Sequence, residues 1–405
     1  MRQSILIVSA LSLAVVAGQT TAPAPQTSGR GGGRGRGGPA IAAPFLALKS
    51  PEVHPDRTVT LRFRAPQATT VEVFGELTQK GLNAGVPMTK GADGIWTATV
   101  GPVPPEIWRY AFRVDGVQVP DPSNPSFDSV AQGIAVNSMV EVPGDSPAFY
   151  DSRPVPHGEV RQVMYESKAM GVTRWVWIYT PPGYEKSSVR YPVLYLLHGN
   201  GESVSGWIWN GRANIILDNL IADREARPMI VVMPQGHAIQ GARVGPLESV
   251  PGETGMFSPK FPKDLLDDVL PLVERTYRVV ADADHRAIAG LSMGGGQSLS
   301  IGMEHADTFH YVLGYSAAVG GNFLDIDHNF EHAFAHPEEL NKKLKLLWFA
   351  IGKQDFIYEG NKAFADRLTA KGIKFTFKQT EGEHVWRVWR NYLHETAPLL
   401  FQASK

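Results

Sequence analysis

The sequence predicts an α/β protein in which a small all-β domain precedes a mostly parallel sheet covered by helices on both faces. From residue 155 onward, short apolar runs such as "PVLYLLHG", "MIVVMPQG" and "LLWFAIG" alternate with helical stretches. That alternation is typical of strands buried on both faces of a parallel sheet. Between residues 46 and 145, apolar and polar residues alternate instead, as in "TVTLRFRAP" and "EIWRYAFRV". A length of 405 residues suits two such domains.

The N-terminus has the layout of a secretory signal peptide. One Arg precedes an apolar stretch from Ile5 to Ala17, and small residues follow. The stretch is short for a membrane span, so residues 1–18 are expected to be cleaved after Gly18. The protein is then secreted or periplasmic, without stable membrane insertion. Residues 19–45 are rich in Gly and Pro and predict a flexible linker.

Composition narrows the classes of partner. The formal net charge is -1, so no basic excess points to nucleic acid or to an anionic membrane surface. The chain has no cysteine, which excludes disulfides and thiol catalysis. Hydrophobic residues make up 43% of the chain, enough for a large core to stabilise an exported protein without disulfides.

Residues 46–145 predict a small immunoglobulin-like β-sandwich. Val59, Leu61 and Phe63 alternate on one face of a strand, and short turn sequences such as "ADG" and "VDG" separate the segments. A role in glycan binding through Trp96, Trp108 or Tyr110 stays open. The alternation of apolar and polar residues in this strand favours a core position for Trp108 and Tyr110.

Residues 155–402 predict the α/β domain. Two strands, "RQVMYES" and "TRWVWIYTPP", come first, and strand–helix alternation follows. The stretch "FPKDLLDDVLPLVERTY" places Leu265, Leu266, Val269, Leu270 and Val273 on one helical face. Pro271 lies inside this stretch, so a local kink is expected there.

The segment "RAIAGLSMGGGQSLSIGM" places Ser292 in a G-x-S-x-G pattern after a short apolar run and before a helical stretch. Glycines permit a tight strand-to-helix turn that exposes the serine hydroxyl at the carboxyl end of the strand. This is the nucleophile elbow of the α/β-hydrolase fold. Ser292 is therefore the candidate nucleophile, although a structural glycine-rich turn gives the same letters.

A serine nucleophile needs a base held by a carboxylate, and α/β-hydrolases place them in the order Ser, acid, His. Asp355 follows the apolar run "LLWFAIG", and His384 follows the next strand in a loop opened by Gly382. These two are the candidate acid and base. Rival acids are Asp325 and Asp327; rival bases are His305, His310, His328, His332 and His336. No buried run directly precedes the two rival acids, and the five rival bases lie in polar, helix-like or loop sequence.

The developing oxyanion needs fixed donors. The backbone N–H of Met293 is the expected first donor, since it follows the nucleophile. The second is expected from the N–H of Asn200, in the loop "HGNGES" after an early strand. Aromatic residues near these loops are candidate substrate contacts, although each suits a core position equally well: Trp207, Trp209, Phe257, Tyr358 and Trp386.

Five segments together resemble carbohydrate esterase family 1, which holds feruloyl and acetyl xylan esterases and is related to esterase D. They are "YPVLYLLHGNGES", "IVVMPQGHA", "FPKDLLDDVLPLVERTYRV", "AIAGLSMGGGQSL" and "EGEHVWRVWRNYLHE". The sandwich resembles, more weakly, the early-set, glycogen-binding-like module that precedes some of these esterases. The resemblance implies an exported serine esterase acting on feruloyl or related acyl esters of plant cell-wall polysaccharide, with no metal and no organic cofactor.

Four alternatives remain open at this point. They are an acetyl xylan or short-chain carbohydrate esterase, a siderophore esterase of the enterochelin type, an acyltransferase and a non-catalytic glycan-binding protein. The sequence does not fix the acyl group, the polysaccharide backbone or the oligomeric state.

Overall fold

The computed structural model describes residues 48–128, 130, 136–238 and 256–402. The predicted signal peptide, residues 1–18, and the predicted linker, residues 19–45, lie outside these residues. Within the described ranges, no helix is both long enough and apolar enough to cross a membrane.

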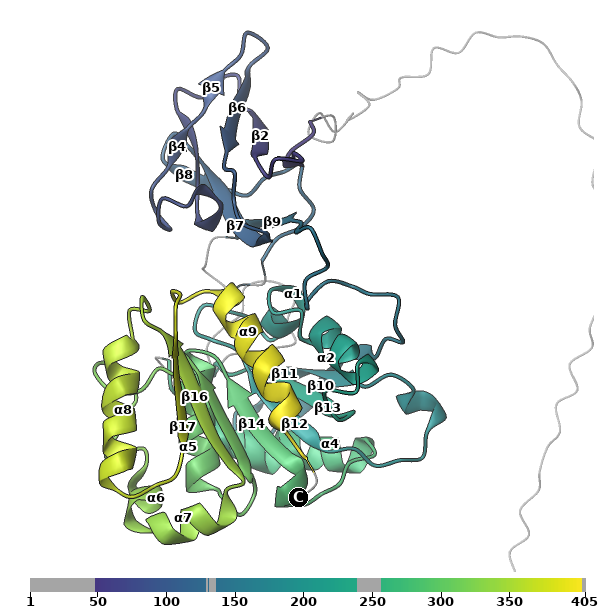
Figure 1. Ribbon diagram of the computed structural model, residues 1–405, viewed down its shortest axis with the longest axis vertical. Coiled ribbons are helices and arrows are strands. Elements are labelled where there is room, and N and C mark those ends of the chain that lie inside the picture. The colour runs from purple at the N-terminus through teal and green to yellow at the C-terminus, as the bar shows by residue number, and fades with distance from the viewer. Residues whose placement is uncertain (1–47, 129, 131–135, 239–255, 403–405) are drawn as a thin grey trace, which may run out of the picture. The chain divides into compact units, whose positions relative to one another are not determined.

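Two antiparallel sheets make up the N-terminal part of the chain (Figure 1). One sheet has the strand order β1-β2-β6-β5, and the other has the order β4-β3-β7-β8, with β9 also paired to β7. The strands are β1 (Glu52–Val53), β2 (Val59–Arg64), β3 (Val71–Phe74), β4 (Val86–Pro87), β5 (Thr89–Lys90), β6 (Ile95–Val100), β7 (Glu106–Val114), β8 (Val117–Val119) and β9 (Ser138–Val142).

The sandwich core forms from the alternating residues of β2 and β7. Leu61 and Phe63 are buried together with Trp108, Tyr110 and Phe112, and the rings of Phe63 and Phe112 lie 4.8 Å apart. The expectation that Trp108 and Tyr110 face the core is confirmed, since they are 2% and 0% exposed. Trp96 is 7% exposed. The three aromatic residues considered for glycan binding therefore pack inside the sandwich.

The second part is a single mixed sheet with the order β10-β11-β13-β12-β14-β15-β16-β17. Its first two strands and β13 pair antiparallel, and the pairs from β13–β12 onward are parallel. The strands are β10 (Glu159–Ser167), β11 (Val172–Thr180), β12 (Val193–Leu197), β13 (Ile230–Pro234), β14 (Arg286–Gly290), β15 (Tyr311–Tyr315), β16 (Leu346–Gly352) and β17 (Thr376–Thr380). The predicted fold class, an α/β-hydrolase sheet after a β-sandwich, is confirmed.

Helices cover both faces of this sheet, as expected for strands that are apolar on both sides. The helices are α1 (Gly206–Trp209), α2 (Ala213–Ala222), α3 (Phe261–Lys263), α4 (Leu270–Thr276), α5 (Met293–Glu304), α6 (Glu331–Ala335), α7 (Pro337–Lys343), α8 (Tyr358–Ala370) and α9 (Trp386–Thr396). In β12, Tyr195 and Leu197 join the core under α4, α5 and α8. Leu194 and Leu196 join the core under α1, α2 and α9 on the other face (Figure 1).

The helical stretch around Pro271 departs from a regular α-helix. Residues Asp264–Val269 wind as a π-helix between α3 and α4, and the N–H of Leu270 bonds to the carbonyl of Leu265. The expected perturbation thus takes the form of a widened turn just before the proline, which has no N–H of its own to donate. The π segment carries the buried carboxylates of Asp264 and Asp268.

One of these carboxylates forms a buried ion pair with the sheet. The fully buried Arg174 of β11 places its Nε 3.3 Å from Oδ2 of Asp264, which is equally buried. Its guanidinium also donates to the carbonyl of His237 at 3.0 Å, so it supports the loop after β13. Burial raises the pKa of Asp264, and Arg174 opposes that rise.

Replacing Arg174 with leucine is expected to lower the free energy of unfolding by about 3–5 kcal/mol, because it leaves the Asp264 carboxylate buried without its cation. Urea denaturation of the full chain measures this. The matched control is Arg161→Leu on β10, whose side chain is 44% exposed and pairs with Glu159 and Glu185. An exposed pair contributes at most about 1 kcal/mol. Equal losses in the two variants would contradict the assignment.

Candidate active site

Ser292 occupies a strained turn between β14 and α5. Its backbone has φ 53° and ψ −116°, a combination that side-chain-bearing residues rarely adopt. The turn is fixed on both sides, since the Ser292 N–H donates to the carbonyl of Tyr315 and its own carbonyl accepts from Ala318 and Gly296. This is the geometry of a nucleophile elbow.

The glycines of the motif are required by close packing. A methyl group on Gly290 would lie 2.4 Å from the carbonyl oxygen of Gly294, and one on Gly294 would lie 2.5 Å from that of His198. Both distances are shorter than any real carbon–oxygen contact. The motif therefore lets α5 start directly against β12 and β14.

The structure brings the candidate acid and base into contact. Asp355 follows β16, and His384 follows the neighbouring strand β17. Nδ1 of His384 lies 2.8 Å from Oδ2 of Asp355, whose side chain is fully buried. The other carboxylate oxygen accepts the N–H of Ile357 at 3.1 Å. With Nδ1 bonded to the carboxylate, Nε2 of His384 is left to act as a base.

Two aromatic rings fix the imidazole plane of His384. The ring centroid of Trp389, on α9, lies 4.9 Å from that of His384 in an edge-on contact. The ring centroid of Phe356 lies 4.7 Å from that of His384. Trp389 is itself held by a 3.1 Å hydrogen bond from its Nε1 to Oγ of Ser316. Phe356 is 74% exposed, so its ring is open to a ligand.

The loop after β12 lies against the nucleophile. A methyl group on Gly199 would lie 3.2 Å from Cβ of Ser292, which places the next residue, Asn200, near the elbow. Met293 is the first residue of α5. The N–H groups of a helix's first turn have no partner within the helix and carry partial positive charge. The oxyanion assignment of Met293 and Asn200 stays a prediction that this arrangement supports.

Two histidines hold residues 198–203, the proposed oxyanion loop, and neither is suited to act as the base. The N–H of Gly236 donates to Nε2 of His198 at 2.9 Å, so the ring proton is on Nδ1, which donates to the carbonyl of Gly199. Burial lowers the pKa of His198 to about 3. His237 lies 3.1 Å from Oδ1 of Asn200 through its Nε2, and burial, aided by the Arg174 charge, lowers its pKa to about 4.

Residues 167–400 match the esterase family described as "Putative esterase". The match spans more than half of the chain and includes Ser292, Asp355 and His384. The chain belongs to this esterase family. The resemblance drawn from the five sequence segments is thereby confirmed at the level of the family.

Relatives of this esterase carry related names. An endo-1,4-β-xylanase/feruloyl esterase of Xylanibacter ruminicola is 31% identical over 87% of this chain and 46% of its own length. The chain spans about half the length of the curated relatives it matches. A ferulic acid esterase of known structure is 28% identical, with a TM-score of 0.53 over 60% of this chain and 98% of its own.

A third similarity covers the sandwich as well. The enterochelin esterase of Shigella flexneri is 18% identical, with a TM-score of 0.65 over 89% of this chain and 97% of its own. At this identity, the similarity shows the shared fold, a β-sandwich followed by the α/β sheet.

The rival residues of the esterase are held in other places. Asp325 accepts the N–H groups of Asp327 and His328, and Asp327 pairs with Arg367. The remaining rival bases are fixed as follows: His310 pairs with Asp284, the rings of His332 and His336 lie 4.8 Å apart, and His305 is the C-terminal cap of α5. His384 pairs instead with Asp355.

The aromatic wall predicted for the esterase requires correction at two positions. Trp207 is 0% exposed and Trp386 is 3% exposed, and their rings meet edge-on at 5.2 Å. These two side chains pack the core under α1 and α9, and they do not present a face to a substrate. Helix α1 has only four residues, too few to reveal the buried side of Trp207. In α9, by contrast, Trp386, Trp389 and Leu393 recur at helical spacing, and this signal could have placed Trp386 in the core.

The other three candidates lie nearer the surface. Trp209 is 57% exposed and lines a cavity of about 550 Å³ together with Phe127 and Arg212. Phe257 lines a separate cavity of about 160 Å³. Tyr358 is partly buried, and its hydroxyl donates to Gln379. All three stay proposed substrate contacts.

Sequence reasoning missed Phe356, His237 and Glu202. The signal for Phe356 was its position directly after Asp355 in a loop. His237 follows the "MPQG" strand end, which is a ligand-facing edge in a parallel sheet. Glu202 is a buried acid in the oxyanion loop, and a single sequence carries no signal for such burial.

Proposed function

We propose that the chain is an exported serine esterase that hydrolyses feruloyl or related hydroxycinnamoyl esters on plant cell-wall polysaccharide. Ser292 is the nucleophile, His384 the base and Asp355 the acid. The observation that carries the proposal is the 2.8 Å contact between His384 and the buried Asp355, at strand ends that share one edge of the sheet with the Ser292 elbow. Export rests on the N-terminal sequence alone.

The mechanism follows from these positions. Nε2 of His384 takes the proton of the Ser292 hydroxyl while Oγ attacks the ester carbonyl carbon. The N–H groups of Met293 and Asn200 stabilise the oxyanion. The carbon–oxygen bond to the sugar then breaks, and the sugar oxygen receives the proton from His384. Water, deprotonated by the same nitrogen, cleaves the acyl-enzyme and releases the free acid.

Asp355 stabilises the imidazolium that forms in each half of the reaction. Its side chain is fully buried, so its charge acts through a medium of low dielectric, where such attraction is strong. The N–H of Ile357 fixes the second oxygen and keeps the carboxylate turned toward His384. The edge contacts of Trp389 and Phe356 on the ring maintain the same orientation.

The substrate class rests on similarity and on the surface beside the base. Two of the similar proteins are named as feruloyl or ferulic acid esterases. Phe356 offers an exposed aromatic face next to His384, which suits the phenolic ring of a hydroxycinnamoyl group. An acetyl group has no ring to use such a face.

The test is paired kinetics on methyl ferulate and acetylated xylan, with Ser292→Ala as the blank. A much higher kcat/KM on methyl ferulate supports the hydroxycinnamoyl assignment. Activity on acetyl esters alone supports a short-chain carbohydrate esterase and removes the proposed role of Phe356. Free acid released in equal amount to the ester consumed distinguishes hydrolysis from acyl transfer. Including an enterochelin-type ester in the panel tests the siderophore alternative.

Trp209→Ala is expected to raise KM for a feruloylated oligosaccharide by about 5- to 30-fold, as for loss of an aromatic contact of ~1–2 kcal/mol. We assign the exposed ring of Trp209 to the sugar part of the substrate. Methyl ferulate lacks this sugar, so its KM should stay at the wild-type value. Met164→Ala on β10 is the control, since Met164 is a similarly exposed apolar side chain, 64% accessible. Equal changes on both substrates would remove the sugar-binding role of Trp209.

A further inference from the structure

Glu202 is a buried carboxylate between the two loops of the proposed active site. It follows Asn200 by two residues and is 7% exposed. Its Oε1 accepts the indole N–H of Trp386 at 3.0 Å, and its Oε2 accepts the side-chain amide of Asn210 at 2.8 Å. Trp386 follows His384 by two residues. One side chain therefore ties the loop of the proposed oxyanion donor to the helix that begins after the proposed base.

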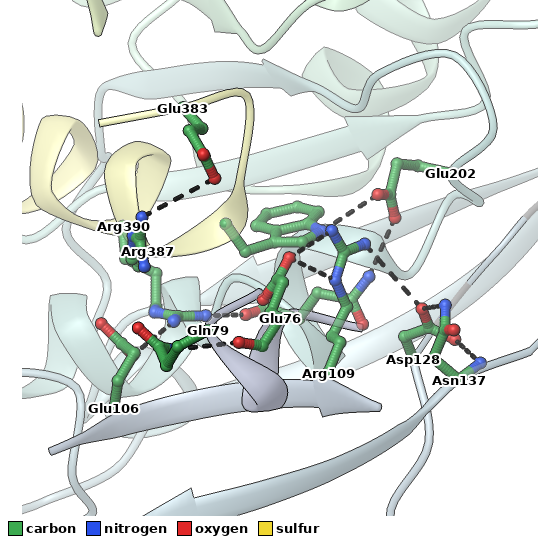
Figure 2. Close-up of polar contacts among 12 residues, drawn as sticks. Glu76, Gln79, Glu106, Arg109, Asp128, Asn137, Glu202, Glu383, Arg387 and Arg390 are labelled. Carbon is green, nitrogen blue, oxygen red and sulfur yellow. Dashed lines mark hydrogen bonds and ion pairs between the residues drawn. The ribbon is translucent and has the colours of Figure 1, made fainter. Parts of the chain in front are cut away.

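The sandwich also places charged side chains near Glu202. Arg109 of β7 pairs with Glu76 at 2.5 Å and lies 3.9 Å from Asp128. Figure 2 shows Arg109 with Glu76 and Asp128 near Glu202. The positive charge of Arg109 attracts the Glu202 carboxylate, while the charge of Asp128 repels it. The main chain of Val130 also forms an isolated antiparallel bridge with that of Glu202.

The same sandwich strand holds the helix α9. Glu106 of β7 lies 2.5 Å from the guanidinium of Arg390 (Figure 2), and Arg390 donates to the carbonyl of Asn210 at 2.7 Å. The guanidinium of Arg387 lies 5.4 Å from the ring centre of Trp108. Strand β7 thus contacts α9 directly, and the charge of its Arg109 acts on Glu202.

We propose that Glu202 is a positioning residue. Through it, the β-sandwich fixes the position of residues 198–203, the proposed oxyanion loop, relative to the loop that carries His384, and Arg109 is its charged partner. The inference rests on the proposed function. It assigns the sandwich a part in catalysis that does not require the sandwich to bind glycan.

The negative charge of Glu202 strengthens its hydrogen bonds with the two segments that it joins. A carboxylate accepts from Trp386 and Asn210 through two charged oxygens. Protonation removes this charge and uses one of the lone pairs, so both hydrogen bonds become weaker. Burial raises the pKa of Glu202 to about 7, and the attraction of Arg109 opposes that rise. We therefore expect the two hydrogen bonds of Glu202, and the alignment that they maintain, to weaken as the pH falls through this pKa and the carboxylate gains a proton.

The experiment measures kcat on methyl ferulate against pH for the wild type, Arg109→Gln, Glu202→Gln and the double variant. Arg109→Gln removes an attraction that lowers the pKa of Glu202, so the acidic limb of kcat should move to higher pH. In the Glu202→Gln background no carboxyl remains to titrate, so Arg109→Gln should leave the limb where it is. Glu202→Gln alone should lower kcat at pH 8 by about 10-fold or more, with KM nearly unchanged.

Controls separate this role from simple stability. Arg113→Gln removes another arginine of β7, which pairs with Glu72, and it should leave the pH profile unchanged. Arg109→Lys keeps the charge and should keep the limb near its wild-type position. An equal shift in both Glu202 backgrounds, or an unchanged kcat in Glu202→Gln, would overturn the inference. If Ser292→Ala stayed active, the proposed function itself would fail; an inactive Ser292→Ala with no coupling between Arg109 and Glu202 removes this inference alone.

Discussion

Ser292→Ala is expected to lower kcat/KM for methyl ferulate by at least about 10⁴-fold, because it removes the oxygen that forms the acyl-enzyme. The variant should fold, since alanine is smaller and the elbow is held by main-chain bonds to Tyr315 and Ala318. Residual activity should come from the oxyanion donors and from substrate binding. Steady-state kinetics together with a melting curve measure both effects.

Ser300→Ala is the matched control for this loss. Ser300 lies on the same helix α5, and its hydroxyl donates to the carbonyl of Asn329 at 3.1 Å. Its removal should leave kcat/KM close to the wild-type value. Similar losses in the two variants would point to damage to α5 and would contradict the nucleophile assignment.

Asp355→Asn is expected to lower kcat by about 10⁴-fold without altering the fold. The asparagine amide would donate to Nδ1 of His384, where the carboxylate now accepts at 2.8 Å. The ring proton would then be on Nε2, and that nitrogen could no longer take the proton of Ser292. Asparagine has nearly the same shape, so it keeps the contact with the N–H of Ile357.

Asp366→Asn tests whether any loss is specific to this carboxylate. Asp366 is exposed on α8, and its replacement should change neither kcat nor the melting temperature. Retention of most of the activity in Asp355→Asn would show that another group orients His384.

The fold was largely predictable because the pattern of apolar and polar residues in the sequence marks its strands. The runs around β12, β13 and β16 are apolar on both faces, and those around β2 and β7 alternate. Local signals such as Gly290 and Gly294 mark the elbow, since only glycine permits that packing. The π-helical turn before Pro271 was foreseen only as a kink, because its geometry depends on where Asp264 and Asp268 find partners in the sheet.

The active-site residues were predictable where chain order and strand ends determine position, as for Ser292, Asp355 and His384. Contacts that depend on which side chains become buried could not be predicted in the same way. Trp207 and Trp386 were expected at the substrate, yet they pack under helices. Glu202 was missed because its environment is assembled from α1, α9 and the sandwich strand β7, and no segment of sequence contains that information.

The central claim is a covalent acyl-enzyme on Ser292. Rapid acid quench of the enzyme during turnover of methyl ferulate, followed by peptide mass spectrometry, tests it most directly. The account predicts that the peptide containing Ser292 gains the mass of one feruloyl group, and that this adduct is absent in Ser292→Ala. A feruloyl adduct on another residue, or undiminished hydrolysis by Ser292→Ala, would contradict it.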